Sequence, residues 1–212
     1  MRARGSGKEQ MGAYGSGASP PRRPVSLLVV LASLIACSAC AHARIIDTPI
    51  LARSLVGTDG ATHPLRPAPN ARLAVLFFFA NHCPCQAAHD RRLRDLYALY
   101  HPRGVDVMGV DSEIGATVDR DAGEVARRRY PFPILLDPGG ALAHGVGAEY
   151  ATESYVLDRN GIVRYHGGID SDRKTLHDDA TPFLGDALDD LLADRPLRRA
   201  EGKALGCALQ MW

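Results

Sequence analysis

Two cysteines, Cys83 and Cys85, stand on either side of a single proline, Pro84. The apolar run 73–79 before them predicts a buried strand, and the residues after them predict a helix. A helix N-terminus presents unpaired backbone N–H groups and the positive end of the helix dipole, and both stabilise a thiolate. Because the thiolate is the nucleophilic and metal-binding form of cysteine, this placement predicts redox or soft-metal chemistry, with Cys83 as the more acidic thiol.

The helix that must position these thiols is predicted to begin beside them and to end near His101-Pro102. Pro84 suits a first helical position, since its φ is preset and its missing N–H would have had no partner there. The residues that form the apolar face recur at spacings of three and four: His89, Leu93, Leu96, Tyr97 and Tyr100.

The one-residue spacing restricts how the two thiols can pair. Positions two apart in a helix point about 200° away from each other, so a Cys83–Cys85 disulfide needs non-helical backbone. Such a bond is expected to be strained and therefore more oxidising than a relaxed one. In the alternative, Cys83 attacks and Cys207, carried by a mobile C-terminal tail, resolves. The sequence leaves both partners open.

The rest of the chain predicts strands interleaved with helices. The Asp59-Gly60 pair predicts a hairpin within 54–61, and Asn160-Gly161 predicts a second one between strands 155–158 and 162–166. Further strands are predicted at 105–110 and 134–136, and further helices at 116–129, from Gly139-Gly140 through Val146, and from Thr181-Pro182 onward. This order predicts an α/β fold with a central mixed sheet, flanking helices and an N-terminal hairpin extension.

The segment from Phe77 to Cys85, the helix after it and the segment 104–111 together resemble a known family. They are similar to thioredoxin-like redoxins of the alkyl hydroperoxide reductase and thiol-specific antioxidant superfamily, which are peroxiredoxin-like. The resemblance continues through 131–137, 154–163 and Gly206-Cys207, and spans roughly Ile50 to Trp212. It implies a thioredoxin-like fold and an enzyme of thiol-disulfide exchange or peroxide reduction. Its substrates would be protein thiols, protein disulfides or peroxides, with a separate reductant.

Three positions depart from the patterns of that superfamily. His82 precedes Cys83 where typical thioredoxins have Trp, and one residue rather than two follows before the second cysteine. Ala80 stands where peroxiredoxins usually have Thr or Ser. Thr152 stands where thioredoxins have a cis-proline that faces the cysteines. We expect a trans peptide bond there, because the cis form costs about 2.5–4 kcal/mol for a non-proline residue.

The predicted catalytic set is Cys83 as nucleophile, Cys85 or Cys207 as resolving thiol, and His82, which would stabilise the Cys83 thiolate or carry a proton. This reaction needs no cofactor. A second hypothesis is a copper-binding or copper-delivery module, because soft ligands gather at one place in the sequence. That metal set comprises His82, Cys83, Cys85 and His89. A third hypothesis is a redox-inactive binding module on the same fold.

Residues 1–36 predict a signal peptide, because Arg and Lys residues precede a short apolar stretch at 25–36. That stretch is too short to cross a membrane, which takes ~20 apolar residues. Leu34-Ile35-Ala36-Cys37 resembles a bacterial lipobox, in which Cys37 is lipidated after cleavage. We therefore expect a lipid anchor on the periplasmic side of the cell envelope. Cleavage after Ala41-His42-Ala43 would instead give a soluble periplasmic or secreted protein.

Composition narrows the class of protein further. The net charge is +1 and the Arg residues are scattered, so nucleic acid is not an expected partner. Five cysteines are too few for a disulfide-dense scaffold. At ~150 residues per domain, the mature chain holds one domain. The predicted organisation is a signal peptide at 1–36, a linker at 37–49, a redoxin domain at 50–195 and a tail with the Gly-Cys motif at 196–212.

Overall fold

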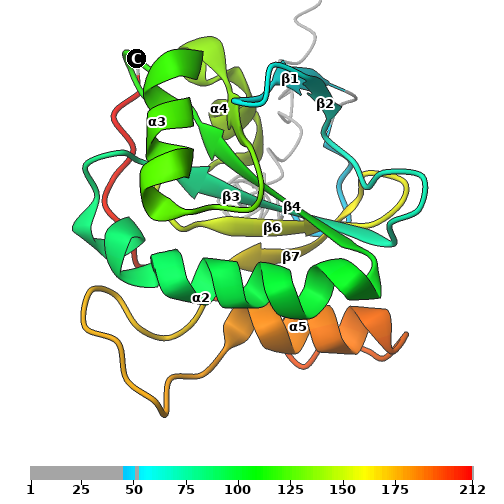
Figure 1. The fold of residues 1–212 in the computed structure, drawn as a ribbon. Helices are drawn as coiled ribbons and strands as arrows, with labels where there is room; N and C mark the ends of the chain where they lie inside the picture. The colour runs from blue at the N-terminus through cyan, green and yellow to red at the C-terminus, as the bar shows by residue number, and fades with distance from the viewer. Residues whose placement is uncertain (1–44, 51–52, 212) are drawn as a thin grey trace, which may run out of the picture. The chain divides into compact units, whose positions relative to one another are not determined.

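The computed structural model describes residues 45–50 and 53–211. The predicted signal peptide, the predicted lipidation site Cys37 and most of the predicted linker lie outside the described residues. Five strands form one mixed sheet in the order β5-β4-β3-β6-β7 (Figure 1). The pairs β3–β4 and β4–β5 are parallel, while β3–β6 and β6–β7 are antiparallel. The strand bounds are β3 Leu73–Phe79, β4 Val105–Asp111, β5 Ile134–Leu136, β6 Ser154–Leu157 and β7 Val163–Gly167.

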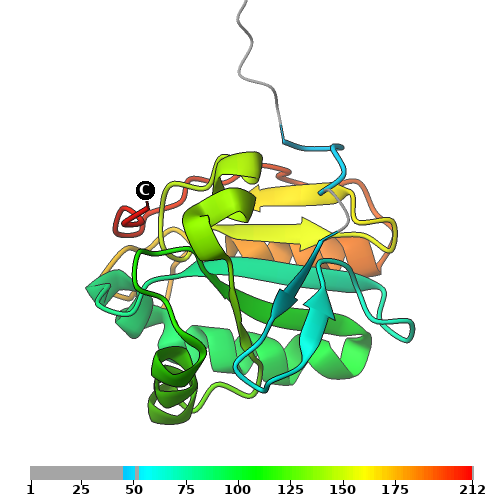
Figure 2. The ribbon, with the colours of Figure 1, turned by 90° about the horizontal axis from the view of Figure 1, so that it is seen from above.

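Strand β3 lies at the centre because both of its faces are apolar. Every residue of Leu73–Phe79 is buried, and alternate side chains enter two separate hydrophobic clusters. Helices α2 (Pro84–Tyr100) and α5 (Phe183–Leu192) cover one face, and helix α4 (Ala141–Val146) covers the other (Figures 1 and 2). Helix α3 (Val118–Arg128) packs beside the edge strand β5.

The predicted elements are confirmed, with shifts of one or two residues at several ends. Helix α2 starts at Pro84 after an extended Cys83, and a short 3-10 turn, His101–Arg103, follows it. Strands β1 (Ser54–Val56) and β2 (Thr62–Pro64) form the predicted N-terminal hairpin as a separate two-stranded sheet. A 3-10 turn, Pro138–Gly140, precedes α4. The expected trans bond before Thr152 is confirmed, since the described residues contain no cis peptide bond. Among the described residues, no helix is both long enough and apolar enough to span a membrane.

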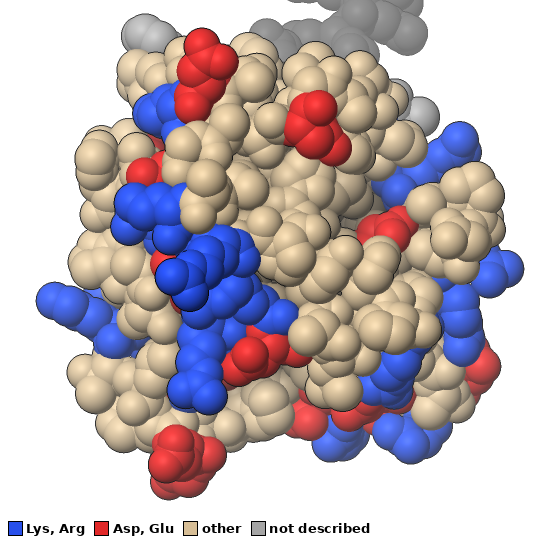
Figure 3. All heavy atoms as spheres, in the orientation of Figure 1, with Lys and Arg blue, Asp and Glu red and all other residues tan. Residues whose placement is uncertain are grey.

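Basic side chains gather on the surface where α3 meets α2, and acidic side chains lie next to them (Figure 3). Arg127 pairs with Glu124 at 2.5 Å, and Arg91 on α2 lies 3.5 Å from Asp95. These carboxylates neutralise much of the positive charge. The surface is therefore a network of ion pairs and not an open basic patch.

The C-terminal tail follows the sheet edge and then turns toward the N-terminus of α2. Glu201 forms a parallel bridge with His166 beside β7, and Ala208 forms an antiparallel bridge with Tyr150. The backbone N–H of Ala151 donates to the carbonyl of Cys207 at 2.8 Å. The expectation of a mobile tail therefore does not describe this state, in which backbone hydrogen bonds hold the tail.

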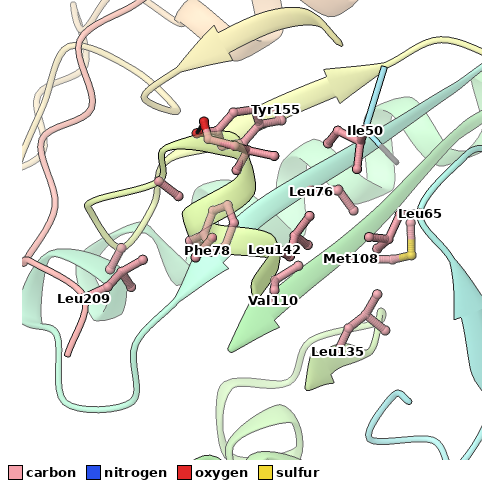
Figure 4. Close-up of a cluster of buried hydrophobic side chains, with 14 of the residues drawn as sticks. Ile50, Leu65, Leu76, Phe78, Met108, Val110, Leu135, Leu142, Tyr155 and Leu209 are labelled. Atoms are coloured by element: carbon pink, nitrogen blue, oxygen red, sulfur yellow. Dashed lines mark hydrogen bonds between the residues drawn. The ribbon is translucent and has the colours of Figure 1, made fainter. Parts of the chain in front are cut away.

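Side-chain burial reinforces this attachment. Leu209 is 8% exposed and belongs to the same hydrophobic cluster as Phe78 and Leu142 (Figure 4). Gly206, immediately before Cys207, lies so close to the neighbouring loop that an added Cβ would be 1.7 Å from the carbonyl oxygen of Ala151. Only glycine fits at this position without a shift of the backbone.

Replacing Gly206 by alanine should push the tail away from Ala151. Because the colliding atom belongs to the backbone, we expect Gly206→Ala to lower the free energy of unfolding by about 1–3 kcal/mol, the usual cost of overpacking. Urea unfolding of the oxidised protein, followed by circular dichroism, measures this change.

Gly145→Ala is the matched control, since a Cβ at this position within α4 would meet nothing within 4 Å. Alanine is favoured over glycine inside helices by up to about 1 kcal/mol, so the control should be neutral or stabilising. Equal losses of stability in both variants would contradict the close-approach argument.

Candidate functional site

A disulfide between Cys83 and Cys207 joins the start of α2 to the tail. The two cysteines are 124 residues apart in sequence, and their Cα atoms are 5.8 Å apart. Cys83 is only 3% exposed, whereas Cys207 is half-buried. Cys85, the third cysteine of the described residues, is buried and has a free thiol. Of the two pairings that the sequence allowed, the structure contains the one with Cys207.

Cys83 is placed by the way in which the chain leaves β3 and enters α2. It caps the helix with extended backbone angles, φ −82° and ψ 115°, and its Sγ accepts a hydrogen bond from the backbone N–H of Gln86 at 3.4 Å. The sulfur therefore lies against the N–H groups at the positive end of the helix dipole. This is the environment that stabilises a thiolate once the disulfide is reduced.

The loop that carries Cys83 is held in place by a buried arginine. Arg128, 3% exposed, donates to the carbonyl of Asn81 at 2.8 Å. The same guanidinium donates to Asp90 at 2.9 Å and to Glu124 at 2.8 Å. Its charge is thus fully paired although it is buried, and the loop is tied to both α2 and α3. Nothing in the sequence pattern singled out Arg128, because Asn81 and Asp90 lie 47 and 38 residues away in the sequence.

The thiol of Cys85 lies close to the disulfide. The sulfurs of Cys83, Cys85 and Cys207 all lie within 4.8 Å of one another. The helical spacing would separate the two sulfurs only if both residues were helical. Cys83 is the cap, and its extended backbone turns its sulfur toward that of Cys85.

The two histidines of the predicted metal set do not join this cluster. His82 is exposed, so its predicted catalytic role stays a prediction. His89 is buried, with Nδ1 2.8 Å from the carbonyl of Cys85 and Nε2 3.2 Å from a carboxylate oxygen of Asp170. Because both ring nitrogens are engaged, His89 is not free to bind a metal. Of the predicted set of His82, Cys83, Cys85 and His89, the structure groups the two thiols with Cys207 and not with the histidines.

His89 and Asp170 form a buried ion pair below the first turn of α2. Burial of the ring opposes protonation, but the hydrogen bonds to Asp170 and to the Cys85 carbonyl, together with the negative charge of Asp170, raise the pKa of His89 above 6.5. Burial likewise opposes ionisation of Asp170, yet its hydrogen bonds to His89, the Asp172 backbone and Arg92 lower its pKa. The Nδ1–H of the imidazole donates to the Cys85 carbonyl and so fixes the backbone at the site.

A buried glutamate organises the loop to which the tail attaches. Glu153 accepts hydrogen bonds from the backbone N–H groups of Glu149 and Tyr150 at 2.9 and 3.0 Å. Its other oxygen lies 2.5 Å from Nε2 of His166 and 3.1 Å from the hydroxyl of Tyr155. Burial opposes its ionisation, but these hydrogen bonds lower the pKa of Glu153. The sequence analysis did not identify Glu153, although its place beside the cis-proline position of thioredoxins was a signal.

A pair of buried aspartates at the carboxyl end of β4 was also missed. Asp111 and Asp121 both bind Arg120, which donates to Asp121 at 2.9 Å and also to Asp111. Burial, followed by the negative charge of Asp121, raises the pKa of Asp111. Asp111 also accepts from the N–H of Glu113, whose carboxylate accepts from the tail residue Gln210. This aspartate cluster therefore holds Glu113 where its carboxylate binds Gln210 of the tail.

Comparison with known proteins decides the family. Residues 46–180, more than half of the chain, match the Redoxin family model. The chain belongs to the Redoxin family. Redoxins include peroxiredoxins and thiol-disulfide oxidoreductases, so the sequence-based resemblance is confirmed at this level.

This redoxin is similar to the chloroplastic peroxiredoxin Q of Triticum aestivum, with 27% identity over 119 residues. The match covers 53% of this chain and 54% of that protein, so the chain spans about half the length of the curated relatives it matches. An uncharacterised conserved protein from Geobacillus kaustophilus has a similar fold, with a TM-score of 0.72, 24% identity, and coverage of 79% of this chain and 92% of that one.

Peroxidoxin BcpB from Mycobacterium tuberculosis also aligns, with a TM-score of 0.54 and 19% identity over 71% of this chain and 98% of that one. At these identities, the two solved structures show the fold alone. The predicted α/β thioredoxin-like fold is confirmed.

The His89–Asp170 pair makes stability depend on pH in a defined direction. Since the pKa of His89 is raised in the folded protein, its contribution is fully present below 6.5 and is lost as the pH rises through the raised value. The difference in the free energy of unfolding between the oxidised wild type and His89→Gln should therefore be larger near pH 5.5 than near pH 9. Urea unfolding at both pH values measures it.

The same substitution in an Asp170→Asn background is the control, because the partner that raises the pKa is then absent. In that background, the loss in the free energy of unfolding caused by His89→Gln should be no larger near pH 5.5 than near pH 9. A difference that grows toward high pH in the wild-type background would show that His89 is neutral in the fold.

Proposed function

We propose that this redoxin reduces peroxides, with Cys83 as the nucleophile and Cys207 as the resolving thiol. The observation that carries the proposal is the Cys83–Cys207 disulfide at the N-terminus of α2. A disulfide in this position is the product expected when an activated thiolate is oxidised and a second thiol then resolves it. The likeness to a peroxiredoxin Q supports the same assignment.

The reaction balances in two steps. The Cys83 thiolate attacks one oxygen of the peroxide, the O–O bond breaks, and the leaving oxygen takes a proton to become water or an alcohol. Cys83 is now a sulfenic acid. The Cys207 sulfur attacks the Cys83 sulfur, the S–S bond forms, and the hydroxyl group leaves as water. A dithiol reductant returns two electrons to complete the cycle.

The difference in burial between the two sulfurs favours a small oxidant. Cys83 is 3% exposed, so the backbone of a disulfide-bearing protein has little access to it, whereas a peroxide is a few atoms in size. Half-buried Cys207 offers the incoming reductant a sulfur that it can attack. Ala80 supplies no hydroxyl to the oxidant, so we assign hydrogen bonding to the peroxide to the backbone N–H groups of the first turn of α2.

A stoichiometric reaction of the reduced protein with hydrogen peroxide tests this assignment. The wild type should form one Cys83–Cys207 disulfide per peroxide consumed. Cys207→Ser should stop at the Cys83 sulfenic acid, which dimedone traps for mass spectrometry. Cys83→Ser should slow peroxide consumption by several orders of magnitude, as loss of the nucleophile does in covalent catalysis.

Cys85→Ser is the matched control, since it removes a neighbouring thiol that is not part of the disulfide. It should still form the Cys83–Cys207 bond. If peroxide leaves Cys83 reduced while a model disulfide such as oxidised glutathione oxidises it, the enzyme is a thiol-disulfide oxidoreductase and peroxide reduction is excluded.

We propose in addition that the protein is exported and anchored to the cell envelope by a lipid on Cys37. The support comes from the sequence: basic residues precede the apolar stretch 25–36, and a lipobox-like tetrapeptide ends at Cys37. An oxidising compartment suits an enzyme that cycles through a disulfide.

Phase partition in a nonionic detergent tests the anchor after expression of the full chain in a bacterium. The wild type should enter the detergent phase, and Cys37→Ala should remain in the aqueous phase. Cys40→Ala is the control and should behave like the wild type. Recovery of the wild type in the aqueous phase, with residues up to Ala43 removed, would indicate ordinary cleavage.

A further inference from the structure

We propose that Cys83, Cys85 and Cys207 form a three-sulfur site for one Cu(I) ion when the disulfide is reduced. The three sulfurs lie within 4.8 Å of one another. This site goes beyond peroxide reduction because it requires Cys85, which that reaction does not use. It also differs from the metal set predicted from the sequence, since it contains no histidine.

The convergence of the sulfurs does not depend on the disulfide bond alone. The tail is held on one side of Cys207 by Gly206, which packs against Ala151, and on the other by the hydrogen bond from the Leu209 N–H to the carbonyl of Glu149. The Ala151 N–H binds the carbonyl of Cys207 itself at 2.8 Å. None of these backbone contacts involves the S–S bond, so we expect them to persist when it is reduced. They keep the sulfur of Cys207 beside the start of α2.

The ligand set selects the kind of ion. Within the part of the chain that the structure describes, the group contains three cysteine sulfurs and no imidazole or carboxylate. Thiolates prefer soft ions, and Cu(I) is satisfied by three of them, whereas structural Zn(II) takes four ligands. His89, which could have been a fourth ligand, uses both ring nitrogens elsewhere.

The surroundings suit an ion that must be kept from water and oxidants. Cys83 and Cys85 are 3% and 4% exposed and belong to a hydrophobic cluster, and Cys207 packs against it. The half-buried side of Cys207 leaves a path for the ion. The N–H groups and dipole of α2 offset the negative charge of the thiolates.

Binding moves no electrons: three thiols release up to three protons, and three Cu–S bonds form. Disulfide formation and metal binding both need the sulfurs of Cys83 and Cys207, so the two states exclude each other. A dithiol reductant that opens the Cys83–Cys207 bond creates the site. A peroxide that oxidises this pair to the disulfide, and is itself reduced to water or an alcohol, releases the ion.

Anaerobic titration of the reduced full-length protein with Cu(I), in competition with the chelator bicinchoninate, tests the site. We expect one ion per chain and three sulfur scatterers in the copper X-ray absorption spectrum. Cys85→Ser should bind Cu(I) more than about tenfold more weakly, since even the loss of an outer-shell partner typically costs 10–100-fold in metal affinity. His144→Ala, which changes an exposed imidazole outside the cluster, should bind as the wild type does.

Equal affinities of Cys85→Ser and the wild type would overturn the proposal, because the redox pair alone would then capture the ion. A spectrum with two sulfurs, or with a nitrogen ligand, would also overturn it, and this measurement needs no variant to fold. Disulfide formation by peroxide is measured on the same wild-type preparation. Normal disulfide formation without Cu(I) binding would disprove only the metal site. Cu(I) binding without disulfide formation would disprove only the redox assignment.

Discussion

The backbone pairing of the tail with residues 149–151 is the constraint on which the site depends. Cys207 comes 124 residues after Cys83, and in an unfolded chain the loop entropy would keep them apart. In the folded protein, the Ala151 N–H donates to the Cys207 carbonyl and Gly206 fits against Ala151. These two contacts offset the entropy cost of closing the loop without help from the disulfide. The second thiol is therefore placed by the fold and not only by the bond that it makes.

Three buried ionic groups hold the segments around the start of α2 in position. Glu153 fixes the loop that receives the tail, Arg128 fixes the loop that delivers Cys83, and the His89–Asp170 pair fixes the Cys85 carbonyl. Each charge is compensated by hydrogen bonds within the fold, as a buried charge must be. Removing one partner would leave the other charge uncompensated. The position of the sulfurs is thus sensitive to residues that do not touch them.

The fold could be predicted from the sequence because its signals are local. The apolar run of β3, the proline after Cys83 and the Asn160-Gly161 turn each specify their own element, and these elements together specify the sheet. The choice between Cys85 and Cys207 as partner of Cys83 could not be predicted, since it depends on the path of the tail across Ala151. Arg128 and Asp170 were missed for the same reason: their partners lie tens of residues away in sequence.

The position of Cys85 shows that the residue at which a helix begins decides which side chains meet. Two helical residues at positions 83 and 85 would point in opposite directions, but Cys83 is the cap and has extended backbone angles. Pro84 reinforces this boundary, since the residue before a proline is disfavoured in helical conformation. The Cys-Pro-Cys motif therefore turns two sulfurs toward one place without a bond between them. A third sulfur held there by the tail can pair with one of them while the other remains a thiol.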